Sequence, residues 1–256
     1  MTPLAVGLCF LFGLIAGSFV NVVAIRIPAG ASIVSPGSAC PECGHPIRPR
    51  DNVPVVSWLV LRGRCRDCGA RISVRYPIVE LSTAILFSLT PIVIGLVWVL
   101  PAYLWFVGVT VTLTITDIDH KLIPNKILYP GTVVGAVLLG VGSLLDGTPR
   151  QFLRGLGGAG IYFTVLLVIA LIAKGGFGFG DVKLAILLGL YTAYQGWDIL
   201  AVAFLLAFLL GGLISIFLLV TRIRGRKDAI PFGPYLIAGA YLALAVGDPI
   251  VAWYLP

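Results

Sequence analysis

Long apolar segments separated by short polar ones dominate the sequence. A helix needs about 20 apolar residues to cross the hydrocarbon of a bilayer. Candidate spans lie near residues 4–25, 78–98, 101–116, 127–145, 155–173, 183–197, 199–221 and 232–254. The third and sixth are short, and the breaks at Pro101 and around Asp198 are weak, so seven spans is the competing count. The pattern predicts an all-α polytopic membrane protein with about eight transmembrane helices.

The composition agrees with this pattern. Hydrophobic residues make up 59% of the 256 residues and charged residues only 11%, whereas a soluble domain carries about 25% charged residues. The first span has no basic segment before it and no small-residue cleavage site before Arg26. We therefore expect it to remain as a membrane helix and not to act as a cleaved secretory signal.

The positions of lysine and arginine predict the orientation, because these residues accumulate in cytosolic loops. With eight spans and an outside N-terminus, the inside segments are 26–77, 117–126, 174–183 and 222–231. They hold 16 of the 18 lysines and arginines, and only Arg150 and Arg154 fall outside. The net charge of +7 is therefore an orientation signal, and we expect no nucleic-acid partner.

One polar segment, residues 26–77, is long enough to fold outside the bilayer. It divides the chain into a first transmembrane helix at residues 1–25, a cytosolic loop domain at 26–77 and a membrane domain at 78–256. The loop mixes arginines with apolar residues. Nucleic acid could bind such a surface, but a loop tethered to the membrane at both ends is better placed to lie on anionic headgroups.

Two C-x-x-C pairs in this loop predict a zinc site. They are Cys40 with Cys43 and Cys65 with Cys68, in the sequences CPECG and CRDCG. Four thiolates satisfy a tetrahedral zinc ion, and the glycine after each pair lets the backbone curl and point its amides at the thiolates. Two disulfides or four idle thiols are the alternatives, although disulfides do not persist in the cytosol. We interpret His45 as a polar loop residue and Cys9, inside the first span, as an apolar filler.

Three aspartates stand at the cytosolic ends of predicted spans: Asp117 and Asp119 after one, and Asp181 before another. Taken singly, Asp181 can be a helix cap, and the other two a solvated helix end paired with His120 or Lys121. Ionisable groups at the membrane edge usually have a partner or a function, however. Two carboxylates at the same depth can share a proton, so that one acts as a general base on water and the other polarises a carbonyl.

The glycines before Asp181 fit this hypothesis. Gly176, Gly178 and Gly180 carry no side chains, so an extended peptide could approach the acid. Their spacing does not match a dinucleotide-binding motif, and the sequence has no H-E-x-x-H, G-x-S-x-G or P-loop motif. The chain has two histidines, and neither lies near a plausible nucleophile for a serine–histidine triad.

These motifs together resemble the bacterial type IV prepilin leader peptidases, which are membrane aspartyl proteases with a G-x-G-D motif. Here the motif is GFGD, from Gly178 to Asp181. The resemblance extends to GSFVNVVAIRIP (17–28), the cysteine loop, RYPIVE (75–80) and DIDHKLIPN (117–125). It places the catalytic aspartates at Asp117 and Asp181, with Asp119 as a rival for the first, and makes Gly178 and Gly180 supporting residues of the motif.

The resemblance implies an aspartic-type endopeptidase of the bacterial cytoplasmic (inner) membrane. Its substrates would be prepilin and pseudopilin precursors, cleaved at the cytosolic face. It also implies N-methylation of the new amino terminus with S-adenosylmethionine, with Glu80 and the basic loop as candidate regions for that activity.

Three rival functions are compatible with the residues. They are a transporter whose membrane-edge aspartates bind protons or cations, a membrane-anchored zinc adaptor without catalysis, and a peptidase that lacks methylation. Transporter sites cluster near the midplane of the bilayer, whereas the aspartates here are predicted to lie at one face.

Overall fold

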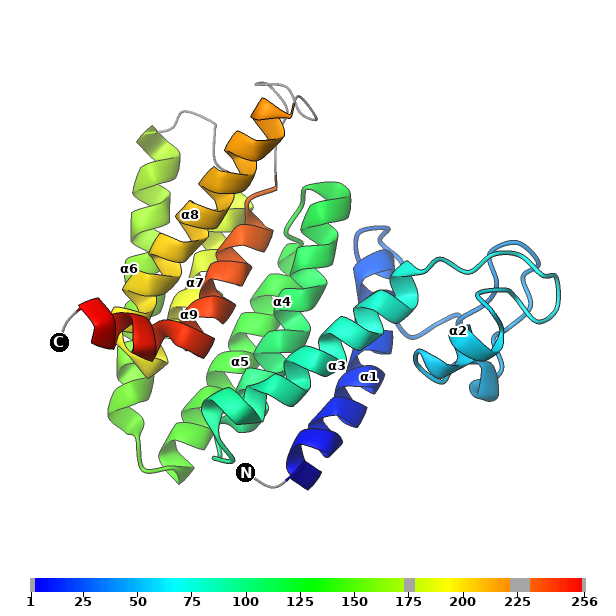
Figure 1. Cartoon of the computed structure of the whole chain (residues 1–256), viewed down its shortest axis with the longest axis horizontal. Helices are drawn as coiled ribbons and strands as arrows, with labels where there is room; N and C mark the ends of the chain where they lie inside the picture. The colour runs from blue at the N-terminus through cyan, green and yellow to red at the C-terminus, as the bar shows by residue number, and fades with distance from the viewer. Residues whose placement is uncertain (1–2, 173–177, 222–230, 255–256) are drawn as a thin grey trace. The chain divides into compact units, whose positions relative to one another are not determined.

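A computed structural model describes residues 3–172, 178–221 and 231–254, and within these ranges every regular element is a helix. The predicted all-α fold is therefore confirmed. The helices are α1 (Pro3–Arg26), the 3₁₀ helix η1 (Pro49–Asp51), α2 (Val56–Val60), α3 (Arg75–Ile94), α4 (Leu100–His120), α5 (Asn125–Leu145), α6 (Pro149–Ile172), α7 (Phe179–Gln195), α8 (Trp197–Val220) and α9 (Gly233–Tyr254) (Figure 1). The predicted site residue Gly176 and the basic residues of 222–230 lie outside the described residues.

The protein is a multi-pass membrane protein. Within the described residues, six helices are long and apolar enough to cross a bilayer: α1, α3, α4, α5, α6 and α8. Helix α7, with 17 residues, and the apolar part of α9, Gly233–Gly247, are shorter. The count of eight spans therefore stays a prediction.

Both weak breaks in the hydrophobic pattern separate helices. Gly95, with a positive φ of 89°, ends α3 before α4 begins at Leu100. Gly196 lies between α7 and α8. Helix α4 is longer than the predicted short third span, because the chain remains helical through the polar residues 117–120.

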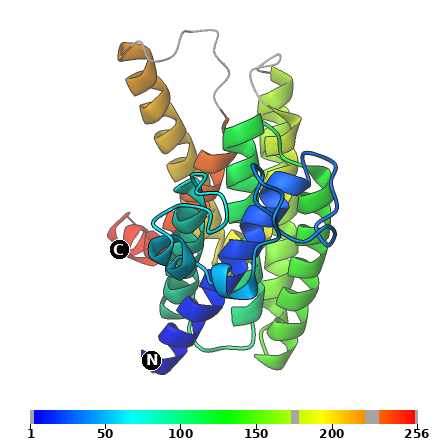
Figure 2. The same ribbon diagram turned by 90° about the vertical axis from the view of Figure 1, so that its right-hand side faces the viewer.

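The chain divides into two units, residues Met1–Leu96 and Val97–Pro256. In the first unit, α1 and α3 run antiparallel, side by side (Figures 1 and 2). Glycines on α1 permit the close approach, because a Cβ added at Gly13 would lie 2.6 Å from the Cα of Ala84, and one added at Gly17 would lie 2.7 Å from the Cα of Glu80. Residues 26–77 connect the two helices, and their separate status as a domain stays a prediction.

Helix α7 is the central element of the second unit. It packs against α5, α6, α8 and α9, and most of its 17 residues are buried. Its closest contact is with α6, where a Cβ added at Gly189 would lie 2.5 Å from the carbonyl oxygen of Gly158. Small residues of this kind let membrane helices approach closely. Because neighbouring helices surround it, α7 needs less contact with lipid than a helix at the periphery.

The turn between α4 and α5 and the start of α9 lie at the same end of the second unit, the upper end in Figure 1. Helix α4 ends at His120, and the left-handed φ of 52° at the next residue, Lys121, turns the chain toward α5. Helix α7 begins at this end too, since Gly180 packs against Ile123 of the turn. Three elements distant in sequence thus begin or end at one place.

Candidate active site and metal centre

Asp117 is a buried carboxylate held by a backbone donor. It lies in the last turn of α4 and is only 5% exposed. Its Oδ2 accepts a hydrogen bond from the N–H of Gly233 at 3.1 Å, across 116 residues of sequence. A Cβ added at Gly233 would lie 2.6 Å from this oxygen. The first residue of α9 therefore reaches the carboxylate only because it is glycine.

Asp181 lies in the first turn of α7 and is 7% exposed. The N–H of Asp181 donates to the carbonyl oxygen of Gly178 at 3.0 Å, so the backbone of Gly178 lies beside the Asp181 side chain. A Cβ added at Gly178 would lie 3.2 Å from Asp181 Oδ2, and one added at Gly180 would lie 3.2 Å from the Cβ of Ile123. The first glycine leaves room beside the carboxylate, and the second lets α7 approach the α4–α5 turn.

Ile123 connects the surroundings of the two aspartates. The side chain is buried in the α4–α5 turn, and Cβ atoms added at Gly180 and Gly233 would lie 3.2 and 3.3 Å from it. One of these glycines precedes Asp181, and the other donates to Asp117. Both aspartates therefore lie around the α4–α5 turn, at one end of the second unit. The structure thus brings the two predicted aspartates together.

Asp119 lies elsewhere on α4. It is exposed, whereas Asp117 is buried. Residues two positions apart do not share a face of a helix, so only one of the two can point toward α7. The geometry favours Asp117 as the partner of Asp181.

Gly233 is absent from the predicted site residues. It contributes a backbone N–H, and the pattern of side chains in a sequence does not indicate which backbone groups donate to a site. The signal that could have pointed to it is the run PFGP at residues 231–234, since a glycine between two prolines marks a special backbone position at the start of a predicted span.

The four loop cysteines lie in two turns of the same design. The N–H of Gly44 bonds the carbonyl of Cys40 at 2.9 Å, and the N–H of Cys40 bonds the carbonyl of His45 at 3.0 Å. The same two bonds recur in the second turn, at 2.9 and 2.8 Å, between residues 25 positions further along. The glycine that follows each pair has a positive φ, of 71° and 74°, as its predicted role in curling the backbone requires.

The sulfur atoms of the four cysteines form one cluster, with all Sγ atoms within 4.8 Å of one another. The Sγ atoms of Cys40 and Cys68 are 3.8 Å apart. A tetrahedral zinc ion with bonds of about 2.3 Å holds its sulfur ligands about 3.8 Å apart. The donor set therefore fits a metal such as zinc. All five cysteines are free thiols, so the alternative of two disulfides is not adopted.

In the first turn, backbone amides favour the thiolate form of one cysteine. The backbone amides of Cys43 and Glu42 lower the pKa of the Cys40 thiol to about 7, whereas the pKa of Cys43, in the same turn, is raised. The thiolate is the form that binds metals, so these amides favour the ligand form. This agrees with the predicted orientation of the amides toward sulfur.

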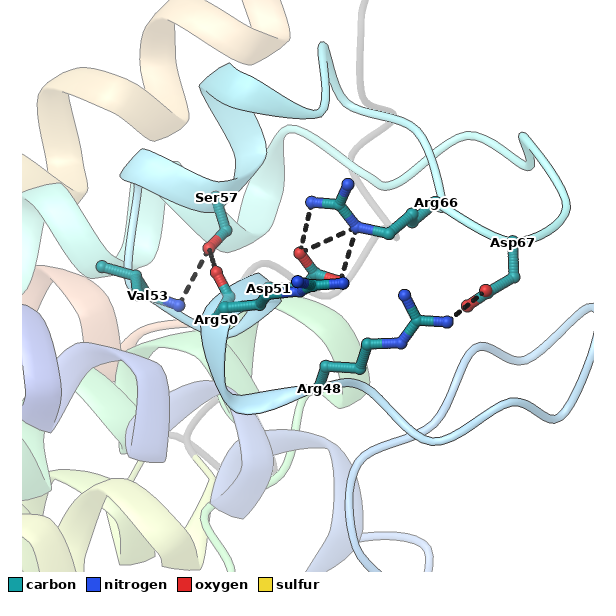
Figure 3. Close-up of polar contacts among 7 residues, drawn as sticks. All are labelled: Arg48, Arg50, Asp51, Val53, Ser57, Arg66 and Asp67. Atoms are coloured by element: carbon teal, nitrogen blue, oxygen red, sulfur yellow. Dashed lines mark hydrogen bonds and ion pairs between the residues drawn. The ribbon is translucent and has the colours of Figure 1, made fainter.

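Two ion pairs brace the second turn (Figure 3). The guanidinium of Arg66 bonds Asp51 at 2.7 Å, and that of Arg48 bonds Asp67 at 2.9 Å. The bond from Arg66 lowers the pKa of the Asp51 carboxyl. Because Arg66 and Asp67 stand between Cys65 and Cys68, the pairs connect the second turn to η1 and the residue before it.

The fold and the site define a class: a helical multi-pass membrane protein with a buried aspartate pair and a four-cysteine loop. Residues 11–94 match the bacterial peptidase A24 N-terminal domain, and residues 104–216 match the type IV leader peptidase family. The chain belongs to the type IV leader peptidase family.

Relatives extend over almost the whole chain. A prepilin leader peptidase/N-methyltransferase of Pseudomonas aeruginosa is 35% identical over 99% of this chain and 94% of its own length. Proteins of the same name from Aeromonas hydrophila and Bacillus subtilis are 37% and 38% identical, over 97% and 96% of this chain and 93% and 96% of their own lengths. No solved structure matches the chain significantly.

Proposed function

We propose that the chain is an aspartic-type endopeptidase that removes the leader peptide from type IV prepilins and pseudopilins. The observation that carries this proposal is the meeting of two buried aspartates, Asp117 and Asp181, at one end of the helical bundle. The curated relatives named above carry the same activity in their names. The transporter alternative has no support.

The paired carboxylates supply both roles that peptide hydrolysis needs. Two carboxyl groups in a buried setting share one proton, since both cannot ionise at short range. The ionised aspartate takes a proton from water, which attacks the scissile carbonyl, while the protonated one donates to the carbonyl oxygen. The amide of Gly233 orients the Asp117 carboxylate, and Gly178 leaves room beside the Asp181 carboxylate, so the pair is held ready for an extended peptide.

Single substitutions test this assignment in the intact protein. Asp117→Asn and Asp181→Asn keep the shape of each side chain but remove the proton transfer, so each should slow leader removal by at least about 100-fold. Asp119→Asn is the matched control, because it changes the exposed neighbour on the same helix. Cleavage of a co-expressed prepilin precursor at the wild-type rate by the Asp117 or Asp181 variant would overturn the proposal.

The site is proposed to face the cytosol of a bacterial cell, in the inner membrane. The support is the distribution of lysine and arginine, of which 16 of 18 fall on one side of the predicted topology. A prepilin with a basic leader and an apolar helix would then leave its helix in the bilayer and present the scissile bond at the membrane edge.

A second activity, N-methylation of the new amino terminus, is proposed with S-adenosylmethionine as the methyl donor. The names of the relatives support it. Zinc is the metal proposed for the cysteine cluster, where Cys40, Cys43, Cys65 and Cys68 would hold it. When bound it would crosslink the two turns of the loop, as structural zinc does in small domains.

A further inference from the structure

Two motifs that the peptidase mechanism does not use meet in the first unit. GSFVN (17–21) lies on α1, and RYPIVE (75–80) opens α3. The backbone of Glu80 is in contact with Gly17, and the Nδ2 of Asn21 donates to the carbonyl oxygen of Tyr76 at 3.2 Å. The seam between α1 and α3 is therefore built from polar residues at the ends nearest the cysteine loop.

Asn21 carries an unpartnered acceptor in this seam. It is 3% exposed, and its Nδ2 also donates to the carbonyl oxygen of Gly17 at 3.3 Å. Its Oδ1 is buried and has no hydrogen-bond partner among the described residues. Leaving a buried acceptor unpaired costs free energy, so this oxygen is a position where a donor from outside the chain would stabilise the protein.

Glu80, one turn after Tyr76 on α3, is the charged member of the cluster and is 8% exposed. The hydroxyl of Ser18 lies beside its carboxylate, and the N–H of Val55 donates to its Oε2 at 2.7 Å. Val55 makes this bond with a φ of 61°, a value that a β-branched residue rarely adopts. The donor to the Glu80 carboxylate is therefore the N–H of a residue with a strained backbone. An incoming N–H group could take its place and let Val55 adopt a more favourable φ.

The cluster offers acceptors: a carboxylate and an orphan amide oxygen, with a hydroxyl beside them. Such a set favours a ligand that is positively charged and donates hydrogen bonds. Building on the proposed function, we propose that Ser18, Asn21 and Glu80 bind the amino terminus of the processed substrate for methylation, and that Glu80 takes the proton that this amine must lose.

The chemistry balances with one co-reactant, a sulfonium methyl donor. The bound ammonium gives one proton to the Glu80 carboxylate and becomes a neutral amine. The nitrogen lone pair then forms the new C–N bond to the methyl carbon, and the C–S bond breaks with its electron pair remaining on sulfur. The donor leaves as a neutral thioether, and Glu80 returns its proton to water. The methylation site would therefore lie in the first unit, and the aspartate pair that cleaves the leader lies in the second.

The test uses the full-length enzyme with a prepilin precursor and S-adenosylmethionine, and reads both products by mass spectrometry. Glu80→Gln should slow methylation by at least about 100-fold, through loss of the proton acceptor, while leader removal continues. Asn21→Leu should raise the substrate concentration needed for methylation more than it lowers the maximal rate. Thr83→Val is the matched control, because Thr83 is buried in the same seam and its hydroxyl is bonded within α3, to Val79 at 2.7 Å.

A pH series separates a chemical role from simple loss of packing. An α-amino group loses its own proton near pH 8, so methylation by Glu80→Gln should recover as the pH rises through that value. The groups beside the Glu80 carboxylate among the described residues, the Ser18 hydroxyl and the Val55 amide, do not titrate in this range. Damaged packing would show no such recovery, and that result would overturn the proposal.

Two further outcomes bear on the proposal. If Glu80→Gln no longer binds S-adenosylmethionine in equilibrium dialysis, the cluster serves the donor and the assignment to the amine is wrong. If all variants methylate like the wild type while cleavage is normal, the inference fails but the peptidase proposal stands. Failure of the wild-type enzyme to cleave any prepilin would instead remove the proposed function itself.

Discussion

Single atoms set the geometry of the aspartate pair. Asp117 is oriented by a main-chain N–H from Gly233, and Asp181 is held by its own N–H, which donates to the carbonyl oxygen of Gly178 at 3.0 Å. Both partner residues are glycines, because a side chain at either position would press on a carboxylate oxygen. The residues that determine the positions of the catalytic groups in the proposed mechanism therefore include two that carry no functional group of their own.

Gly233→Ala should impair cleavage without unfolding the protein. The added Cβ would lie 2.6 Å from Asp117 Oδ2, so the carboxylate or α9 must shift, and small displacements of catalytic groups can cost about 100-fold in rate. The measurement is the rate of leader removal by the purified variant. Gly108→Ala on α4 is the control, because an added Cβ there meets nothing within 4 Å. Equal rates for the two variants would contradict the positioning role of Gly233.

At the scale of elements, contact between α6 and α7 depends on glycine. Gly158 and Gly189 allow their backbones to touch, and this contact places the helix that carries Asp181. In the cysteine loop, a different feature positions the residues: the same hydrogen-bonded turn occurs twice, at residues 40–45 and 65–70. Each copy contributes two thiols, so neither copy alone offers a complete metal site.

Gly158→Ala should destabilise the second unit. The new methyl group would collide with Ala193 and with the carbonyl of Gly189, and overpacking of this kind costs about 1–3 kcal/mol. Gly160→Ala is the control on the same helix, since its added Cβ meets nothing within 4 Å and the gain in helix propensity is the same. Unfolding in detergent, followed by circular dichroism, should separate the two variants. A Gly158 variant as stable as the Gly160 variant would show that the backbones can separate at little cost.

Removal of the metal should loosen the loop and leave the membrane helices intact. The loop contains arginines at which trypsin cleaves, including Arg48 and Arg66, and its fold depends on joining the two turns. We expect a chelator to expose residues 26–77 to trypsin and added zinc to restore protection. Cys43→Ser should behave like the chelated protein, whereas Cys9→Ser, which changes a thiol of α1 outside the cluster, should keep the metal. Trypsin resistance after chelation would contradict a structural metal.

At the scale of the whole molecule, hydrophobic patterning predicted much of the fold. Each predicted span corresponds to a helix, because apolar length is what a bilayer selects. The short helix α2 and the repeated turns of the loop have no such signal, since local hydrogen bonds determine them. Chemistry predicted that Asp181 pairs with an aspartate at the end of another span, and the resemblance to the peptidase family selected Asp117 over Asp119. The PFGP run was the only signal for Gly233, and the packing of Ile123 had none, because backbone donors and packing contacts depend on tertiary structure.

The distribution of basic residues gives a test of topology. Arg150 is exposed near the start of α6, and Lys121 is exposed at the end of α4. With the predicted orientation, a cysteine placed at 150 should react with a membrane-impermeant thiol reagent in intact cells. A cysteine placed at 121 should react only after the cells are opened, with the unmodified protein giving the background. The opposite pattern would reverse the orientation and place the aspartates on the outer side.

The enclosure of α7 has a consequence for how the protein is made. A segment of 17 residues with an acidic group in its first turn is a poor candidate for stable insertion by itself, because a bilayer retains segments of about 20 apolar residues. Its partners are distributed on both sides of it along the chain, with α5 and α6 synthesised earlier and α8 and α9 later. During biogenesis, α7 would therefore have to remain beside α6 until α8 and α9 have been synthesised. The proposed catalytic site would then be complete only after α9 has been synthesised, because Gly233 at the start of α9 donates to Asp117.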